Sequence, residues 1–590
     1  MDWVQVGLLV GGGLVLVVLT HEIPGMCNDT SRLATAEALV EHGRFAIDRT
    51  RFEYTCDKIR VDGAFYSDKP PLLSIYLAGV YGVLRATVGW SFDAALPSLY
   101  YTLTLLTSGL GLLLTLLGVY RLVRMFGAGR GWSALTAAAA CGATLMLPFS
   151  VVLSSHAASA PCLVWLALWL IRVERAETPE AEGLGRGRAA AIGGLAALAP
   201  AIEPLAVAFT LPMVVAFFWP AERRGFAGWA IAGAALPAIP HAAICWSIAG
   251  NPIALNLNPA YFQYEGSMHT AENLSGTGFA HDSLWAFLRY AYHSIFGYRG
   301  AVLYNPPAAV GAVAAGWLCY RRETVRVFGA SLVGLGLFFA LTLGFSDNYS
   351  GWTYGVRWHA TPAPMFAGFA GAAVAVASGR AARIWRLGTL ATGALGLALG
   401  LLGTVNPWTP TTRERYSFVE VFSAETPYLE AHLKKAEELF RDGHYHEARY
   451  QAEHALRRDD TFAPAWEIAV VASARLGDKA RLRDYARTFS QIADQLDPKA
   501  RRLIAARLKK ALRSLEQEGG GTRTDAIGSG AAAPTERIPR GPAVSPGSRR
   551  APGPDVSIPL SRVSWRRSDE RWTGTNGPFC SAPSVRSSPG

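Results

Sequence analysis

Residues 97–120, PSLYYTLTLLTSGLGLLLTLLGVY, decide the class of fold. The segment contains no charged side chain and is dominated by Leu, with Tyr, Val and Gly between. A helix needs roughly 20 apolar residues to cross the hydrocarbon core of a bilayer. The segment therefore predicts a transmembrane helix.

Apolar segments of similar length recur on both sides of it and predict eleven spans in all. The predicted spans are 3–20, 97–120, 132–151, 156–173, 189–203, 204–220, 226–249, 301–319, 327–345, 357–378 and 387–404. The short pair around Glu203-Pro204 leaves open one kinked helix or two. The composition is 51% hydrophobic and 17% charged, whereas a soluble domain carries about 25% charged residues. A soluble protein and a largely disordered chain are both excluded.

The short basic loops give the expected orientation. Arginines gather at 121–130, 172–188, 223–224, 321–326 and 380–386. Cytoplasmic loops are enriched in Lys and Arg, and eleven spans put all five loops on one face. We therefore expect a cytoplasmic N-terminus and outer loops at 21–96, 250–300 and 346–356. High Ala, Gly and Arg usage without organelle signals favours a bacterial inner membrane.

The first outer loop, residues 21–96, is long and not uniformly polar. Residues 30–42 predict a helix with Asp29 as its N-cap. Residues 71–86 are apolar but start at a double proline, and a crossing there would put the 121–130 loop outside. We expect them to lie in the membrane interface. Cys27 and Cys56 share this loop, where a disulfide can persist, so we expect them to be bonded.

The chain changes character after Asn406. Residues 406–427 are predicted as a linker, and the charged, Ala/Leu-rich residues 428–516 as a small α-helical domain. Gly443 and Gly477 are 34 residues apart, the period of the tetratricopeptide repeat (TPR). Residues 517–590 have no periodicity and predict a disordered basic tail. This tail and the basic loops explain much of the net charge of +11, so we expect no nucleic-acid partner.

Charged side chains gather at two points of the first outer loop. Asn28-Asp29-Thr30-Ser31-Arg32 follows the first span, and Asp68-Lys69 precedes the interfacial segment. A carboxylate at the lip of a membrane cavity can act as a general base, and Arg and Lys can hold a lipid-linked phosphate. Alternatively, Asp29 only caps a helix, and Arg32 and Lys69 bind phospholipid headgroups. Residue types alone do not decide between the two.

The order of these residues resembles the GT-C membrane glycosyltransferases. The pattern is Asp29 just past the first span, Arg32 three residues later, an Ala-rich helix ending at Gly43, and Tyr66-Ser67-Asp68-Lys69-Pro70-Pro71-Leu72. It is most similar to the branch of the aminoarabinose lipid A transferases and protein O-mannosyltransferases. The resemblance covers residues 1–405 in layout and residues 29–72 in detail.

The resemblance implies a reaction and a role for each residue. Members of that branch transfer a sugar from a polyprenyl-phosphate carrier on the outer face of the membrane. Asp29 matches their catalytic acid, and Arg32 and Lys69 match positions that hold the carrier phosphate. The family often has a second acid where this chain has Thr30, which weakens the case for a metal-binding acid pair. We assign no cofactor and no metal ligand, although a divalent metal stays open.

Later residues are candidates for the same cavity. Residues 348–359, NYSGWTYGVRWH, resemble a glycine-tyrosine-glycine-x-arginine stretch of bacterial members, so Arg357 is predicted to bind phosphate. An aromatic belt with an interfacial arginine is the alternative. Three cations at membrane depth would repel each other unless an anion joined them, which predicts a bound phosphate. The other candidate cavity residues are Tyr66, Asp68, His156, Glu203, Tyr354 and His359.

The sequence therefore favours an all-α polytopic glycosyltransferase with a TPR-like domain outside the cytoplasm. Its expected partners are a polyprenyl-phosphate sugar, the lipid bilayer and a protein held by the TPR-like domain. A catalytically inactive polytopic scaffold is the main competitor, supported by Thr30. A transporter or flippase would need inverted repeats or charges deep in several spans.

Overall fold

The computed structural model describes residues 2–520 except 54, 177–183, 265–266, 268–279, 410–414, 424 and 459. Nearly all of the predicted disordered tail, residues 517–590, lies outside the described residues. The described residues up to Leu515 form one compact unit.

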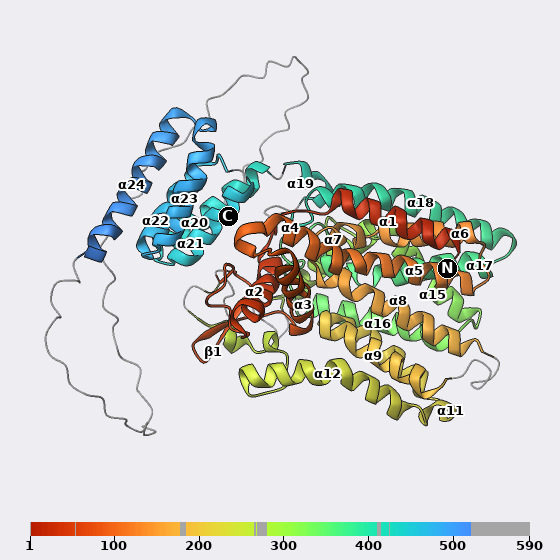
Figure 1. Cartoon of the computed structure of the whole chain (residues 1–590). Helices are drawn as coiled ribbons and strands as arrows, with labels where there is room; N and C mark the ends of the chain where they lie inside the picture. The colour runs from red at the N-terminus through yellow and green to blue at the C-terminus, as the bar shows by residue number, and fades with distance from the viewer. Residues whose placement is uncertain are drawn as a thin grey trace, which may run out of the picture. The chain divides into compact units, whose positions relative to one another are not determined.

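The described chain is almost entirely helical, which confirms the all-α polytopic class (Figure 1). Within the described residues, six helical segments are long and apolar enough to cross a membrane. They are α3 (Pro71–Val88), the run Phe92–Met125, α8 (Ser155–Glu174), α12 (Ala227–Ala249), α16 (Val325–Gly344) and α18 (Gly379–Val405). The run Phe92–Met125 joins α4 (Phe92–Thr104), a π-helical turn (Leu105–Gly109) and α5 (Leu110–Met125).

Shorter helices complete the bundle, and prolines and glycines set several of their ends. They are α1 (Trp3–Leu19), α6 (Arg130–Gly142), α7 (Met146–Ser150), α9 (Arg186–Ile202), α10 (Val207–Phe218), α11 (Ala221–Arg224), α13 (Leu284–Ile295), α14 (Ala301–Tyr304), α15 (Pro306–Tyr320) and α17 (Ala363–Val376). The predicted span 132–151 is divided between α6 and α7. The segment around Glu203 is two helices, because Pro204 cannot continue the hydrogen-bond ladder of α9. The count of eleven spans stays a prediction.

Small residues let the helices of the bundle approach closely. A Cβ on Gly193 of α9 would lie 1.8 Å from the Ala230 carbonyl of α12, and one on Gly233 would lie 1.8 Å from the Ala190 carbonyl. Gly111 of α5 meets the Ala157 carbonyl of α8 in the same way, at 2.3 Å. Membrane helices associate through such small-residue contacts, because lipid gives no hydrophobic drive between them. These contacts hold α9 against α12 and α8 against α5.

The first outer loop folds into helix α2 (Cys27–His42), a hairpin and α3. The hairpin pairs β1 (Lys58–Val61) with β2 (Ala64–Ser67) in antiparallel register. Its turn residues Asp62 and Gly63 have φ of 48° and 86°, which a two-residue Asp-Gly turn favours. The sequence analysis did not predict these strands, although Asp-Gly between β-branched and aromatic residues was the available signal.

Helix α3 packs against α2 through a buried cluster that includes Leu33, Leu73, Leu77 and Tyr81. Its position in the membrane interface stays a prediction, since α3 is also long and apolar enough to cross.

The C-terminal helices are α19 (Ser417–Ser423), α20 (Glu425–Arg441), α21 (Tyr445–Arg458), α22 (Ala463–Arg475), α23 (Lys479–Ile492) and α24 (Pro498–Gly520). Gly443 and Gly477, with φ of 83° and 68°, lie in the turns after α20 and α22. Only glycine takes this left-handed conformation without strain. Trp466 of α22 is buried against the Tyr485 ring of α23, with centroids 5.7 Å apart. The TPR assignment stays a prediction.

Candidate functional site

Asp29 lies in the first turn of α2 and is fully buried. The helix starts at Cys27 with Met26 as its N-cap, so the prediction that Asp29 caps the helix was wrong. Its Oδ2 accepts hydrogen bonds from the Tyr100 hydroxyl at 2.7 Å and the Gly25 amide at 3.2 Å. Among the described residues, Oδ1 of Asp29 has no hydrogen-bond partner. One carboxylate oxygen is therefore held, and the other remains available.

The surroundings of Asp29 favour its protonated form. Burial raises the pKa of Asp29 to about 7, and the hydrogen bonds from Tyr100 and Gly25 and the charges of Arg32 and Arg357 oppose this only in part. A carboxylate with a pKa near the working pH is suited to proton transfer.

Arg32 is buried one turn along α2, where the side chain of Asn28 holds it. Its Nη1 donates to the Asn28 carbonyl at 2.9 Å and also to the Asn28 side-chain oxygen. Burial lowers the pKa of Arg32, and the charges of Glu203, Asp68 and Asp29 raise it. In the described part of the chain, Arg32 Nε has no hydrogen-bond partner.

Arg357 reaches the same place from the last outer loop. Its guanidinium lies 5.7 Å from the centre of the Trp408 ring, and its backbone amide donates to Ser350 Oγ at 3.0 Å. The carboxylates of Asp57, Glu203, Asp29 and Asp68 act on its charge. Its Nε, like that of Arg32, finds no hydrogen-bond partner among the residues described.

Lys69 follows strand β2 and is held by two carboxylates. Its Nζ lies 2.7 Å from Asp57 Oδ2 and 2.9 Å from Asp68 Oδ2. Ser67 at the end of β2 shares a 2.6 Å hydrogen bond with Ser31 of α2. The hairpin therefore carries Asp68 and Lys69 to α2, where the charge of Asp68 acts on Arg32.

His156 and Glu203 form a pair at the ends of two bundle helices. His156 lies in the first turn of α8, and its Nδ1 is 3.0 Å from Oε2 of Glu203, which follows α9. Ser155 Oγ donates to the same oxygen at 2.8 Å. The charge of Arg32 acts on both His156 and Glu203, and the charge of Arg357 acts on His156. The polar turn predicted around Glu203 is thus part of the same region.

We call these side chains the outer cluster: Asp29, Arg32, Asp57, Asp68, Lys69, His156, Glu203 and Arg357. The structure brings together Asp29, Arg32, Lys69 and Arg357, which the sequence predicted as one site. The premise that Asp29 supplies the only negative charge was wrong, whereas the bound phosphate itself stays a prediction. Asp57, Asp68 and Glu203 add three carboxylates to Asp29, so the three cations already have acidic neighbours.

Three candidate cavity residues do not belong to the outer cluster. Tyr66 precedes Ser67 in β2 and packs on the opposite side, against the cluster with Ile59 and Leu255. Tyr354 is buried in the core, where its hydroxyl donates to the Leu399 carbonyl at 2.7 Å. His359 lies between the rings of Phe338 and Phe339 and lines an apolar cavity of about 270 Å³.

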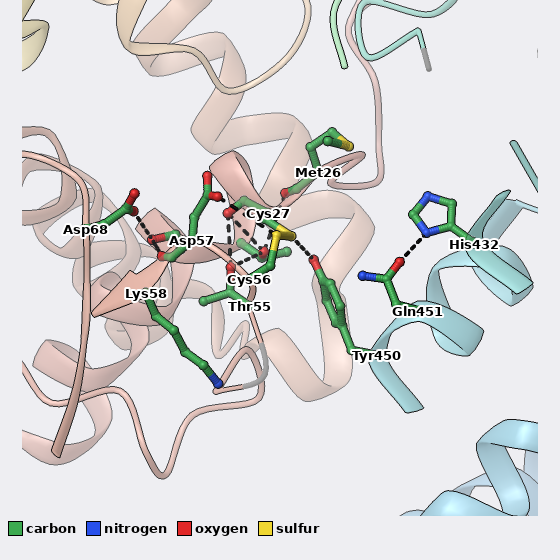
Figure 2. Close-up of a disulfide and its surroundings, with 12 residues drawn as sticks. Met26, Cys27, Thr55, Cys56, Asp57, Lys58, Asp68, His432, Tyr450 and Gln451 are labelled. Atoms are coloured by element: carbon green, nitrogen blue, oxygen red, sulfur yellow. Dashed lines mark hydrogen bonds between the residues drawn. A yellow bond between two sulfur atoms is a disulfide. The ribbon is translucent and has the colours of Figure 1, made fainter. Parts of the chain in front are cut away.

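Cys27 and Cys56 form a disulfide beside the outer cluster, with Cα atoms 5.5 Å apart (Figure 2). It joins the first residue of α2, two positions before Asp29, to the residue before Asp57. Tyr450 of α21 points its hydroxyl at this bond, 3.0 Å from Cys27 Sγ. Because a disulfide sulfur carries no proton, Tyr450 is the donor.

Thr30 stands where the GT-C pattern often has a second acid. Its hydroxyl is buried and donates to the Cys27 carbonyl at 3.2 Å and to Thr55 at 3.0 Å. This side chain thus supports the segment around the disulfide. Within the described residues no group of three or more His, Cys, Asp or Glu side chains is arranged to hold a metal ion.

No protein-family model and no curated protein matches this chain. Solved structures do match it at low sequence identity.

ArnT from Cupriavidus metallidurans bound to undecaprenyl phosphate is 17% identical, with a TM-score of 0.43, covering 84% of this chain and 81% of that one. The oligosaccharyltransferase of Archaeoglobus fulgidus in the apo form is 13% identical, with a TM-score of 0.40, covering 74% of this chain. The match spans only 59% of that longer protein. At such low identities and TM-scores these matches do not carry a function, which has to rest on the side chains of this chain.

Two residues that contact the predicted site residues were not predicted from the sequence. Tyr100 holds Asp29 from inside the predicted span 97–120, where a hydroxyl near the outer end was the available signal. Asp57 pairs with Lys69, and its only signal was its place directly after Cys56 in the predicted disulfide.

Proposed function

We propose that this chain is a membrane glycosyltransferase that takes a sugar from a polyprenyl-phosphate carrier at the outer face of a bacterial inner membrane. The acceptor is an envelope lipid, glycan or protein. The N-terminus and the arginine-rich loops are cytoplasmic in this proposal, and the C-terminal helices are outside.

The observation that carries the proposal is the state of Asp29. Its Oδ2 is fixed by Tyr100 and Gly25, while its buried Oδ1 lacks a partner among the described residues. Its pKa is raised to about 7. A buried carboxylate that only stabilised the fold would be expected to satisfy both oxygens. This arrangement supports a general base that accepts a proton from the acceptor.

The two arginines supply the site for the carrier phosphate. Arg32 and Arg357 both act on the charge of Asp29, and Nε of each lacks a hydrogen-bond partner among the described residues. Guanidinium groups bind phosphate oxygens in a planar, often bidentate geometry. Lys69 is engaged by Asp57 and Asp68, so it supports the site by holding these acids in place.

The proposed step is a displacement at the anomeric carbon. Asp29 removes the acceptor proton, the acceptor oxygen or nitrogen attacks the anomeric carbon, and the bond to the carrier phosphate breaks. The departing phosphate takes the electron pair, and Arg32 and Arg357 stabilise its charge. Asp29 later releases the proton to solvent.

The C-terminal helices are proposed to orient the acceptor or a partner protein. Tyr450 of α21 contacts the disulfide beside Asp29, and His432 of α20 lies against Trp352 of the last outer loop, with ring centroids 5.3 Å apart. A ligand held by these helices would therefore be presented near both loops that build the outer cluster.

A non-catalytic scaffold is the second candidate. The observation in its favour is that the cluster's cations have carboxylate neighbours, which is also what a purely structural network requires. A scaffold would keep its fold and its protein partners when Asp29 is neutralised, and it would not bind the carrier.

The deciding experiment is a donor panel. Purified protein in nanodiscs is incubated with polyprenyl-phosphate sugars and a membrane extract as acceptor, and released carrier phosphate is measured. We expect release with at least one donor, and its loss in Arg357→Gln. If native mass spectrometry detects no bound donor from the panel, the glycosyltransferase proposal fails and the scaffold leads.

A further inference from the structure

Helix α13 turns its more apolar face away from the rest of the protein. Five large side chains form this face, and each is between 48% and 75% exposed: Leu284, Trp285, Leu288, Tyr292 and Phe296. Tyr290 and Ser294, on the opposite face, are buried. A surface helix in water shows the reverse arrangement, with its apolar face toward the core. The exposed face of α13 therefore fits an apolar environment.

The start of α13 is tied to the end of a helix that can cross a membrane. The Ala280 amide donates to the Gly344 carbonyl at 2.9 Å, and Nε2 of His281 donates to the Leu343 carbonyl at 2.7 Å. Gly344 is the last residue of α16, which is long and apolar enough to span the bilayer. Such a helix ends where the hydrocarbon core gives way to lipid headgroups. This places α13 at that boundary.

The residue types on the exposed face match that depth. Trp285 and Tyr292 each carry a polar N–H or O–H group on an apolar ring, and such rings concentrate at the level of the headgroups. Leucine and phenylalanine on the same face are typical of helices that lie in the plane of the interface. The chemistry and the depth of the face both indicate lipid as its partner.

The protected face of α13 holds the last outer loop. The Tyr290 ring lies 4.5 Å from the Tyr349 ring, and its hydroxyl lies 3.4 Å from Ser346 Oγ. The Tyr298 ring, just after the helix, lies 5.5 Å from the same Tyr349 ring. Two rings of the 290–298 segment therefore pack on Tyr349.

This loop has a strained backbone next to Arg357. Tyr349 and Ser350 both have a left-handed conformation, with φ of 49° and 66°. A residue other than glycine keeps this conformation only where its surroundings impose it. Ser350 Oγ accepts a hydrogen bond from the Arg357 amide at 3.0 Å. The packing of α13 on Tyr349 thus helps to fix the backbone of Arg357.

We propose that α13 lies in the headgroup region of the leaflet at this end of the bundle, which is the predicted outer side, with its exposed face toward the acyl chains. Lipid contact there holds α13 against the last outer loop and keeps that loop in its strained conformation. The membrane surface is thus a structural partner of the loop that carries Arg357. The proposal does not depend on the glycosyltransferase function.

The position of the face is tested with brominated phosphatidylcholine in nanodiscs, because bromine quenches tryptophan at contact distance. An interfacial helix buries its apolar face by about 5–10 Å. The fluorescence that is lost in Trp285→Phe should therefore be quenched more by bromine near the headgroup than by bromine near the chain end. Trp466 is buried in α22, so the fluorescence lost in Trp466→Phe should respond to neither lipid. No quenching of the Trp285 share by either lipid would overturn the proposal.

The effect on the loop is tested by hydrogen exchange in nanodiscs. Leu284→Asp with Leu288→Asp puts two charges on the exposed face, so amide exchange over residues 349–357 should become roughly tenfold faster or more. Ala505 and Ala506 of α24 are exposed, and Ala505→Asp with Ala506→Asp adds the same charge away from the loop. This control should change the exchange by less than about twofold. Equal acceleration by both double variants would mean a general effect of charge and would contradict the proposal.

A second variant separates lipid contact from contact with the loop. Tyr290→Ala removes the ring that packs on Tyr349 and leaves the exposed face intact. Exchange over residues 349–357 should rise as in the aspartate variant, while the quenching of Trp285 should persist. Unchanged exchange in α22 shows that either variant is folded. If exchange over residues 349–357 stays at the wild-type rate in both variants, α13 does not hold the loop and the proposal is wrong.

The competing occupant of the face is a second copy of this chain. Mass photometry of the nanodiscs tests it, because Leu284→Asp with Leu288→Asp would then convert a dimer into a monomer. We expect the same mass for the wild type and this variant. A loss of dimer, together with no quenching of Trp285 by brominated lipid, would assign the face to the second copy and overturn the proposal.

Discussion

The outer cluster and the arginine-lined cavity lie at opposite ends of α8 and illustrate two ways of placing cations in a membrane protein. His156 in the first turn and Arg172 in the last turn are 16 residues apart, about 24 Å by helix rise. In the outer cluster, Arg32, Lys69 and Arg357 have four carboxylates around them. At the other end, Arg121, Arg172, Arg175 and Arg188 line a cavity of about 540 Å³ beside apolar side chains, and Arg175 pairs with Glu323.

The difference follows from burial. A buried charge needs a partner inside the protein, because no water is present to solvate it. A charge at the membrane surface can take its partner from lipid or solvent. Catalysis is therefore expected in the outer cluster, where one acid is left with an available oxygen.

The largest effect is expected from Asp29→Asn. The variant keeps the shape and the hydrogen bond from Tyr100 but cannot accept a proton. Turnover should fall by roughly a hundredfold to ten-thousandfold, the usual range for a lost general base, while donor binding stays within about threefold. Carrier phosphate release and donor binding are measured side by side. The exposed Asp62→Asn in the hairpin turn is the control, and an equal loss there would remove the special role of Asp29.

The disulfide should contribute strongly to the outer region and nothing to the arginine-lined cavity. Cys27 and Cys56 are 29 residues apart, and closing a loop of that length stabilises a fold by about 3–4 kcal/mol in the chain-entropy model. Cys27→Ser with Cys56→Ser should therefore lower the apparent unfolding temperature and expose the first outer loop to protease. Cys319→Ser, far from this loop in sequence, is the control and should change neither.

Breaking one ion pair of the outer cluster should lower the free energy of unfolding nearly as much as removing the disulfide. Lys69→Met removes the cation that contacts Asp57 and Asp68 directly, which should lower the free energy of unfolding by about 3 kcal/mol. Adding Asp57→Asn should restore part of it, because the uncompensated charge is removed. Lys435 pairs with Glu438 at the surface, so Lys435→Met should stay within about 0.5 kcal/mol. No rescue by Asp57→Asn would mean that the two side chains act independently.

The pH dependence should report Asp29 directly. Its pKa is raised to about 7, so the base is protonated at pH 5 and kcat/KM should rise about tenfold per unit up to neutral pH. The bound carrier phosphate adds negative charge beside Asp29 and disfavours its ionised form. The acidic limb of the kcat profile should therefore lie at a higher pH than the acidic limb of the kcat/KM profile. Ionising the buried acid also disfavours the folded state, so its destabilising effect grows from about pH 4 to pH 7. Asp29→Asn should remove this loss of stability between pH 4 and pH 7. If the pH profile of kcat/KM is unchanged in the variant, the acidic limb belongs to another group.

The smallest effect is the response to salt. Raising NaCl from 50 to 500 mM should shrink the stability difference between wild type and Lys435→Met, because exposed charges such as the Lys435–Glu438 pair are screened within a Debye length. The stability difference between wild type and Lys69→Met should change little, because that pair is mostly buried. Equal salt sensitivity of both would mean that the two regions are solvated alike.

Much of the fold could be predicted from the sequence. Long uncharged segments such as residues 97–120 indicate helices, because each needs only its own length and composition to satisfy its backbone in lipid. The spacing of Asp29 and Arg32 and the Asp68-Lys69 pair indicated a polar site in the first outer loop, since residues three apart on a helix share a face. Local patterns of this kind do not require knowledge of what packs against them.

The tertiary structure alone decided which of these side chains meet and in what state. It brought Asp57, Glu203 and Tyr100 to Asp29, Arg32 and Lys69, and it moved Tyr66 and Tyr354 away. No sequence pattern predicts which of these side chains lie together, because strand register and helix packing decide it. Both depend on the whole chain. The sequence determined the helices and the chemical groups available, whereas tertiary contacts between segments set burial, charge balance and the pKa of Asp29.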